Sequence, residues 1–395
     1  MSNANTITVR SFAKINLGLV IGPPDYRQDG FHELRTVYQT VAMHDRITVR
    51  VEKASGASIE IRCDDPRVPC DASNTCWKAA ELLMTATKST GKVVITIEKN
   101  LPIQGGLGAA SGNAVSTMLA LEKALKKPLD PERRLEIAAQ VGSDVPLFLI
   151  GGTVLGIGRG EQVIPLPELP PLNIVIVTPL ISISTPKAFR DWDDLFAATD
   201  CRAELRPEQS SGTELHAADL NTSAAKAGEL SKQYGTTKVV PLQLNSGVPL
   251  QFKSGKLTVA GQSATLDKFS HKVGTWLMGG STATSGVPAR SGVRANKGGD
   301  RVEALLLDLV RTGIGNDFEH VVFHPFPALR DIKERLLRLR AKYASLSGSG
   351  SAVYGLFTTK AQAEKAAKTL NAAGMPARAT VTLTRQQYWR QIWKS

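Results

Sequence analysis

A glycine-rich stretch in the first third of the sequence has a composition that suits phosphate binding. The stretch LPIQGGLGAASGNA, residues 101–114, contains Gly105, Gly106 and Gly108 within four positions. The alternating segment KVVITIEK precedes it, and apolar residues at helical spacing follow from Val115 onward. Between a strand and a helix, main-chain N–H groups can approach a ligand closely, and the unpaired amides of the first helical turn attract an anion. The stretch is compatible both with a phosphate site and with a tight turn that binds nothing.

Two common kinds of phosphate loop do not match this stretch. It lacks the lysine of the motif G-x-x-x-x-G-K-[ST], and its glycine spacing differs from that of the dinucleotide motif G-x-G-x-x-G. The chain also lacks the H-R-D and D-F-G motifs of protein kinases. If the stretch binds phosphate, it therefore does so in another type of site.

Two charged residues elsewhere could act on a hydroxyl group that attacks a phosphate. Asp144, in the segment GSDVP, has the chemistry of a general base, although an aspartate two residues before a proline is typically a helix N-cap. Lys14 lies among apolar residues of an early strand-like segment. Its ammonium could stabilise a developing negative charge, or the side chain could extend to the surface, as lysines in such surroundings usually do. Spacing alone favours the structural alternative at both positions.

The elements that must position these residues follow from periodicity. The segments TITVRSFAKINLGLVI, DRITVRVEK and ASIEIRC predict strands, whereas SNTCWKAAELLMTAT predicts a helix capped by Ser73 or Asn74. Near the C-terminus, SGSGS (347–351) lies between Leu346 and the alternating AVYGLF, so we expect a tight turn into a buried strand rather than a flexible linker. At 395 residues the chain is too long for one ordinary core, and two domains are expected.

The overall composition excludes several classes of protein. Hydrophobic residues make up 42% and charged residues 21% of the chain, as in a soluble globular protein. No run of about 18 apolar residues predicts a transmembrane helix, and the N-terminal MSNANTITVR lacks the pattern of a secretory signal. The four cysteines lack C-x-x-C spacing, so free thiols are expected rather than a zinc site or disulfides. We therefore expect a cytoplasmic protein without a membrane partner.

The net charge of +12 is concentrated in one part of the chain. Residues 221–299 contain ten Lys or Arg and two acidic residues, Glu229 and Asp267. Aromatic interleaving and zinc-finger spacing are absent there, so we expect no nucleic acid partner, and a basic protein can equally attract a polyphosphate substrate. The Ser, Thr, Gly and Lys content predicts a solvent-exposed insertion, with a hairpin or two over 238–261 and disorder over 279–300. A partner-binding module is the alternative.

The pattern P-x-x-x-G-L-G at 102–108 resembles the nucleotide loop of the GHMP small-molecule kinases. Further stretches typical of that family occur in the family's order: SFAKINLGL (11–19), DGFHELRTVYQT (29–40), GSDVPLFLIGGTVLGIGRGE (142–161), GNDFE (315–319) and SLSGSGSAVYGLF (345–357). The resemblance covers roughly residues 5–195 and 301–390. It implies an α+β fold of two domains with the active site in the cleft between them. Residues 1–170 would hold the Gly-rich ATP loop, and residues 171–395 would be interrupted by the insertion at about 221–299.

Within this family, the combination of A-K-I-N-L with D-G-F-H-E is typical of kinases that phosphorylate the 2-hydroxyl of 4-diphosphocytidyl-2-C-methyl-D-erythritol in non-mevalonate isoprenoid precursor synthesis. The resemblance implies ATP and Mg²⁺ as cofactors, this small molecule as the substrate, and a monomer or homodimer. Two alternatives remain. The chain could be another GHMP kinase, acting on homoserine or a sugar, or a binding protein that kept the fold and lost catalysis.

The resemblance also implies roles for individual residues. Asp144 has the position of the family's catalytic aspartate in G-x-D-V-P, and Lys14 that of the cation beside it in A-K-x-N-L. Asn16, Phe31 and His32 match substrate positions, where the aromatic ring stacks on cytosine and the histidine hydrogen-bonds its edge. Many relatives have tyrosine where this chain has Phe31, so stacking is retained and any hydroxyl contact is lost. From the residues alone, Phe31 would be a core residue and His32 a surface histidine.

The nucleotide side is assigned by the same resemblance. The matching positions are Asn74, Lys99, Pro102, Ile103, Gln104, Gly105, Gly106, Leu107, Gly108, Ala109, Ala110, Ser111 and Gly112. Main-chain amides of such a loop wrap the triphosphate, and the following helix points its positive end toward it. Lys99 could equally be an exposed lysine at a strand end. Relatives often have serine at the position of Gly112, so no side-chain contact with phosphate or magnesium is expected there.

Overall fold

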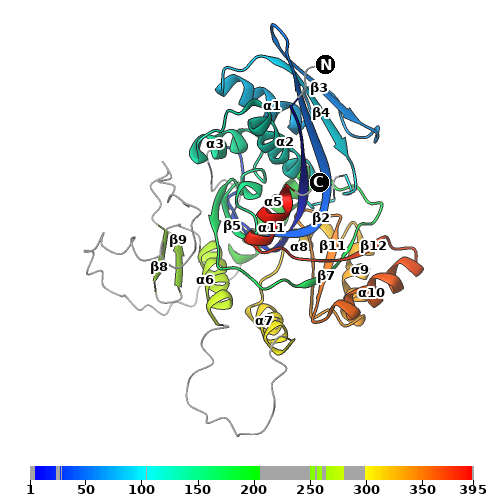
Figure 1. Ribbon diagram of the computed structural model, residues 1–395. Helices are drawn as coiled ribbons and strands as arrows, with labels where there is room; N and C mark the ends of the chain where they lie inside the picture. The colour runs from blue at the N-terminus through cyan, green and yellow to red at the C-terminus, as the bar shows by residue number, and fades with distance from the viewer. Residues whose placement is uncertain are drawn as a thin grey trace.

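The chain forms two β-sheets with helices packed around them. The computed structural model describes residues 5–23, 27, 29–103, 105–204, 250–253, 256–259, 264–279 and 299–393. Figure 1 shows the blue and cyan N-terminal elements at one end of the molecule and the orange C-terminal elements at the other. Among the described helices, none is both long enough and apolar enough to cross a bilayer.

Six strands form the first sheet. They are β1 (Asn5–Ile21), β2 (Leu34–Glu52), β3 (Ala57–Cys63), β4 (Gly91–Glu98), β5 (Thr153–Gly158) and β6 (Gln162–Pro165). The strand order is β3-β4-β2-β5-β6, and β1 pairs antiparallel with β2 along nearly its whole length. The strands predicted over 6–21, 45–53 and 57–63 lie in β1, β2 and β3, which confirms them.

Helices cover one face of this sheet. They are α1 (Thr75–Ala86), α2 (Ala109–Leu125), α3 (Pro131–Val141) and the short α4 (Leu147–Ile150). Asn74 caps α1 by accepting a hydrogen bond from the amide of Cys76, which confirms one of the two predicted caps. Leu83 of α1 and Met118 of α2 are fully buried against the sheet in the first hydrophobic core. Because its buried face packs on the sheet, α2 is held in place directly after the glycine stretch.

The second sheet contains four strands. They are β7 (Asn173–Val177), β10 (Tyr343–Leu346), β11 (Val353–Phe357) and β12 (Ala377–Val381), in the order β10-β11-β7-β12. The helices of this half are α5 (Thr185–Glu204), α7 (Gly299–Thr312), α8 (Phe318–Val322), α9 (Pro327–Arg338) and α10 (Lys360–Ala372). The last helix, α11 (Arg385–Ile392), returns to the first half, where Tyr388 is buried in the first core.

The two sheets share a second hydrophobic core. Ile15 and Leu17 of β1 pack there with Ile176 of β7 and with Tyr354 and Leu356 of β11. Each of these side chains is at most 1% exposed, so the two halves are joined by a dry contact. The mixed architecture agrees with the α+β prediction, and the boundary proposed between the domains stays a prediction.

One segment of the predicted exposed insertion over 221–299 belongs to the core, which corrects the sequence prediction. Helix α6 (Ala264–Gly279) lies within that range, and its Phe269, Val273 and Trp276 are at most 3% exposed in the second core. Their spacing of four and three residues is that of one helical face. The polar residues around them lower the average hydrophobicity of the stretch, and this average masked the pattern.

A buried arginine joins α6 to the first sheet. Arg35 of β2 is 2% exposed, and its guanidinium donates to the carbonyl of Leu266 at 2.9 Å and to the hydroxyl of Ser270 at 2.8 Å. It also donates to the carboxylate of Asp267 at 3.0 Å. A buried guanidinium without such partners would be strongly unfavourable, so α6 is required by the strand that it covers.

Besides α6, the structure describes residues 250–253, 256–259 and 299 of the 221–299 range. The antiparallel pair β8 (Leu250–Lys253) and β9 (Lys256–Val259) confirms a hairpin within 238–261. Of the disorder predicted over 279–300, residues 280–298 lie outside the described residues.

Candidate active site

A lysine and an aspartate from distant segments meet beside the glycine stretch. The ammonium of Lys14 lies 3.1 Å from Oδ2 of Asp144 and donates to Oδ1 of Asn16 at 2.8 Å. Lys14 and Asn16 are two residues apart on β1 and so point to the same face, and Lys14 is 2% exposed. The alternative in which Lys14 extends to the surface is therefore wrong. A buried cation held between a carboxylate and an amide can stabilise negative charge on a neighbouring oxygen.

Asp144 lies in the turn between α3 and α4, with its side chain 34% exposed. The N-cap alternative is wrong for this residue, because α4 begins at Leu147 with Pro146 as its N-cap and has no side-chain cap. The carboxylate instead accepts a hydrogen bond at 2.8 Å from the hydroxyl of Tyr38. One oxygen of Asp144 thus meets the hydroxyl, the other meets the ammonium, and part of the group is open to solvent.

The glycines of the loop are required by close neighbours. Gly106 and Gly108 have φ angles of 71° and 68°, a region that favours glycine. A Cβ on Gly106 would overlap the carbonyl oxygen of Ser347, and one on Gly108 would lie 2.9 Å from Cγ of Lys14. Gly108 is the N-cap of α2 and provides no side-chain hydrogen bond to it. The main-chain N–H groups in the first turn of α2 therefore have no side-chain cap and are available to an anion. Gln104 lies outside the described residues.

The predicted tight turn at 347–351 is confirmed, and it is bonded to the glycine loop. The hydroxyl of Ser347 donates to the carbonyl of Gly106 at 2.9 Å, and the amide of Ala352 donates to the carbonyl of Gly105 at 3.1 Å. β11, which follows the turn, is buried throughout. These contacts hold the loop against the second sheet and bring both halves of the chain to the site.

The two outlying residues of the nucleotide group, Lys99 and Asn74, have structural partners. Lys99 forms an ion pair with Asp45, which is fully buried and also accepts from the side chain of Asn113 at 3.0 Å. The amides of residues 100 and 101 donate to the same carboxylate, each at 2.7 Å. Lys99 is 11% exposed, so it is not the exposed strand-end lysine of the alternative. Asn74 donates to the carbonyl of Pro69 at 2.6 Å besides capping α1.

Gly112 faces the strand that carries Lys14. A Cβ at this position would lie 2.9 Å from the carbonyl oxygen of Phe12 and 2.9 Å from Oγ of Ser11. The close approach of α2 to β1 therefore explains glycine here in packing terms.

Phe31 and His32 lie on the loop that precedes β2, and both have neighbours suited to a flat ligand. Phe31 is 52% exposed, so the core alternative is wrong, and the guanidinium carbon of Arg159 lies 4.7 Å from its ring centroid. The ring of His32 stacks on Phe189 at 4.6 Å, and its Nε2 lies 2.7 Å from Oδ1 of Asp193. His32 is partly buried rather than a free surface histidine.

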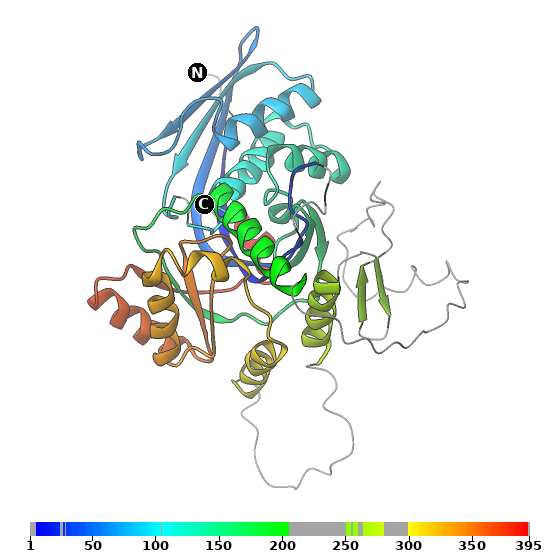
Figure 2. The same ribbon diagram turned by 180° about the vertical axis from the view of Figure 1, so that it is seen from behind.

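Phe189 and Asp193, the two neighbours of His32, belong to α5, the bright green helix of Figure 2, which packs against α8. Sequence reasoning missed Phe189, Asp193 and Tyr38. A phenylalanine and an aspartate on an amphipathic helix, or a tyrosine in a buried strand, give no sign of a partner far away in the chain. Only the folded structure shows that these three residues belong to the site.

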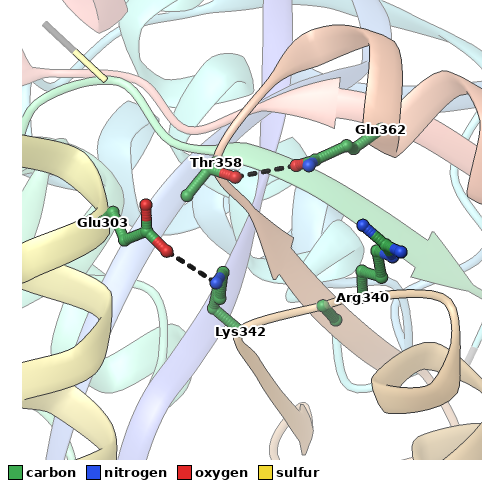
Figure 3. A pocket seen from close by; sticks show the side chains of 6 residues that line it. Glu303, Arg340, Lys342, Thr358 and Gln362 are labelled. Atoms are coloured by element: carbon green, nitrogen blue, oxygen red, sulfur yellow. Dashed lines mark hydrogen bonds and ion pairs between the residues drawn. The ribbon is translucent and has the colours of Figure 1, made fainter. Parts of the chain in front are cut away.

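Two of the hollows among the described residues differ in their surroundings. One, of about 590 Å³, lies at the ends of β3 and β4 and is lined by Asp64, Asp65, Pro66, Arg67, Ile97, Glu98 and Lys99. The other, of about 360 Å³, lies in the C-terminal half (Figure 3). There Lys342 pairs with Glu303 at 2.6 Å and Thr358 donates to Gln362 at 2.7 Å. Four polar side chains of the second hollow thus bind one another in two pairs, whereas the first hollow adjoins the strand that leads into the glycine loop.

The described part of the chain offers no ready cluster of metal-ligating side chains. Within the described residues, no group of three or more His, Cys, Asp and Glu side chains could hold one. Magnesium that is carried by the phosphates of a nucleotide would not require such a group, because this ion is usually held by one or two carboxylates together with phosphates and water.

Comparison with known proteins gives matches across the chain. Residues 74–152 match the model of the GHMP kinases N terminal domain, and residues 302–375 match that of the GHMP kinases C terminal domain. The chain is 29% identical over 395 residues to a 4-diphosphocytidyl-2-C-methyl-D-erythritol kinase of Solibacter usitatus, covering 100% of this chain and 94% of the relative. It is 35% identical over 252 residues to the protein of the same name in Rhodococcus jostii, covering 63% and 77%.

Solved structures share the fold. A crystal structure of 4-(cytidine 5'-diphospho)-2C-methyl-D-erythritol kinase superposes with a TM-score of 0.58 at 23% identity, covering 95% of this chain and 99% of that one. Homoserine kinase from Cytophaga hutchinsonii superposes with a TM-score of 0.60 at 17% identity, covering 98% of both chains. At these identities the structural likeness supports the fold alone. The choice among the activities of GHMP kinases rests on the sequence relatives.

Proposed function

The chain belongs to the 4-diphosphocytidyl-2-C-methyl-D-erythritol kinases of the GHMP kinase family, and we propose that Lys14 and Asp144 carry out its phosphoryl transfer. It is an ATP-dependent kinase that phosphorylates the 2-hydroxyl of 4-diphosphocytidyl-2-C-methyl-D-erythritol. The observation that carries the proposal for the two residues is the contact of 3.1 Å between their charged groups, next to the glycine loop.

Asp144 takes the proton of the acceptor hydroxyl in this proposal. Its carboxylate is partly exposed and has unused lone pairs, as a general base requires. As the hydroxyl oxygen forms its bond to the γ-phosphorus, the bond from that phosphorus to the departing ADP oxygen breaks, and the proton moves to the carboxylate. Lys14 stays protonated and offsets the charge that develops on the attacking oxygen. Asn16 helps to hold the ammonium in place by accepting a hydrogen bond from it.

The nucleotide would lie along residues 102–112. Support comes from the left-handed backbone of Gly106 and Gly108 and from the α2 N-terminus, which has no side-chain cap. The hollow of about 590 Å³ beside Lys99 has room for a nucleoside base and adjoins the start of the loop. Magnesium, when bound with the nucleotide, would neutralise charge on the transferring phosphoryl group. Lys99 and Asn74 would act by holding the strand end and α1 in place, since both are already bonded within the protein.

The cytidine end of the acceptor would lie at Phe31 and His32. Phe31 offers an exposed ring face, and its partner Arg159 belongs to the turn that also borders Asp144 through Gly160. If Nε2–H donates to Asp193, Nδ1 of His32 is left to accept a hydrogen bond from the amino group of cytosine. The distance between the aromatic end and Asp144 would be spanned by the diphosphate and the sugar alcohol.

A direct assay separates this proposal from its alternatives. Purified protein is incubated with labelled ATP and magnesium and with the cytidyl substrate, homoserine or a hexose in turn. We expect transfer of label to the cytidyl substrate and background transfer to the others. Preferred transfer to homoserine or the sugar would make the chain another GHMP kinase, and ATP binding without transfer to any acceptor would make it an inactive relative.

A further inference from the structure

Tyr38 lies within the stretch 29–40, but the sequence assigns it no role in the site. Its ring is 1% exposed and lies on β2 directly opposite Asn16 of β1. Its hydroxyl donates to Oδ1 of Asp144 at 2.8 Å, while Oδ2 of the same carboxylate pairs with Lys14 at 3.1 Å. The Lys14 ammonium also lies 5.5 Å from the centroid of the Tyr38 ring. The tyrosine therefore touches both charged members of the reacting pair.

Two glycines leave room for this side chain. A Cβ on Gly160 would overlap the hydroxyl oxygen of Tyr38, and one on Gly156 would overlap the edge of the ring. Gly160 has a φ angle of 101°, a backbone conformation that side chains with a Cβ rarely adopt. Packing alone would be satisfied by phenylalanine at position 38. The space left by Gly160 is matched to the hydroxyl group itself.

The hydroxyl is a permanent donor. Burial, and next the negative charge of Asp144, raise the pKa of Tyr38 well above its ordinary value, so the proton stays on the tyrosine at any working pH. A neutral donor on Oδ1 fixes the plane of the carboxylate and does not compete for the proton of the substrate hydroxyl. With Oδ1 and Oδ2 each held, rotation about the Cβ–Cγ bond of Asp144 is blocked.

We propose that Tyr38 is a positioning residue that sets the orientation of the Asp144 carboxylate for proton transfer. The proposal rests on the proposed function of Asp144. It requires that Tyr38 act through Asp144 and have no part of its own in binding either substrate. A carboxylate free to rotate would spend less time aligned with the acceptor hydroxyl, and this loss falls on turnover rather than on binding.

The first test is the variant Tyr38→Phe, with Tyr388→Phe as the matched control. Tyr388 is also 1% exposed, and its hydroxyl donates to a main-chain carbonyl, that of Phe148, at 2.7 Å. Tyr38→Phe should lower kcat about 10-fold and leave the KM of both substrates within about two-fold. Tyr388→Phe should leave kcat at the wild-type value. Equal kcat in Tyr38→Phe and wild type would overturn the proposal, as would a loss expressed mainly in KM.

A double-mutant cycle with Asp144→Asn separates positioning from general damage to the fold. If Tyr38 acts through Asp144, Tyr38→Phe should change the residual turnover of Asp144→Asn by less than about two-fold. A further 10-fold loss in that background would show independent damage and overturn the proposal. The proposed function is judged separately, because it fails when the wild-type protein does not phosphorylate the cytidyl substrate, whatever the tyrosine variants do.

Discussion

Oδ2 of Asp144 and the ammonium of Lys14 lie 3.1 Å apart, although one residue belongs to a turn between helices and the other to the first strand. The strand buries the cation and the turn leaves the carboxylate partly exposed. Such a pair has one buried member and one accessible member. This division suits proton transfer from a substrate that enters from solvent.

Replacing Asp144 by asparagine keeps the shape of the side chain and removes the base. We expect kcat to fall about 100-fold or more while the KM of both substrates changes little. The matched control is Asp308→Asn, because Asp308 has the same 34% exposure and pairs with Arg311 at the same distance of 3.1 Å on α7. Steady-state kinetics on the purified proteins provide the check. Near-normal turnover in Asp144→Asn would leave this carboxylate with a structural role.

Removing the imidazole at position 32 should weaken recognition of the cytidine end. His32→Ala is expected to cost about 1–3 kcal/mol in binding of the cytidyl substrate, because the cytosine edge is left unpaired, while the KM of ATP holds. Asp193→Asn should act in the same direction with a smaller effect, since it disturbs the partner that orients the ring. An equal loss of ATP affinity would mean that His32 supports the fold.

The buried helix α6 should be needed for stability. Trp276 is 1% exposed and its indole N–H donates to the carbonyl of Leu305 at 3.1 Å. Trp276→Ala should lower the free energy of unfolding by about 3–5 kcal/mol, from lost burial and the cavity left behind. Trp393→Ala, at a tryptophan 37% exposed, is the control and should cost much less. Urea denaturation measures both, and a change below about 1 kcal/mol in Trp276→Ala would agree with the original expectation of a solvent-exposed insertion.

Asp317 should make stability depend on pH. Its carboxylate accepts from the amide of Ile21 at 2.9 Å, and burial raises its pKa above the ordinary value of 3.8. A raised pKa means that the folded state binds the proton more tightly than the unfolded state does. Its contribution to stability is therefore full below about pH 4 and is lost as the pH rises through the folded-state pKa.

The variant Asp317→Asn lacks this titration. Its stability relative to wild type should therefore increase between about pH 4 and pH 7, as measured by urea denaturation at several pH values. Asp331→Asn, at an exposed aspartate of α9, controls for the general loss of one negative charge. A constant difference between Asp317→Asn and wild type across this range would contradict the prediction.

Local features of the sequence predicted much of this molecule. The first strand, the cap at Asn74, the helix after the glycines and the turn at 347–351 depend on neighbours in sequence, and the structure has all of them. The contacts of Tyr38 with Asp144 and of His32 with Asp193 join residues that are far apart along the chain. No pattern of hydrophobicity or turn chemistry encodes such a pairing, because the two residues meet only after the sheets and helices have packed together.

The buried face of α6 was hidden for another reason. Three apolar residues at helical spacing were present, but they stand in a stretch whose average composition is polar and basic. Averaging over 79 residues removes a signal carried by one helical face. A window the length of a single helix would have kept it.

The bonds from Ser347 and Ala352 to the glycine loop fix an order of events during synthesis of the chain. When the ribosome has released the first sheet, the loop, Lys14 and Asp144 are all present, but the carbonyls of Gly105 and Gly106 have none of these partners. The partners, at residues 347 and 352, emerge after the whole of the first sheet and after helices α5 to α9. A nascent chain is thus unable to complete its nucleotide loop until the turn at 347–351 has been made, long after Lys14 and Asp144 are both present.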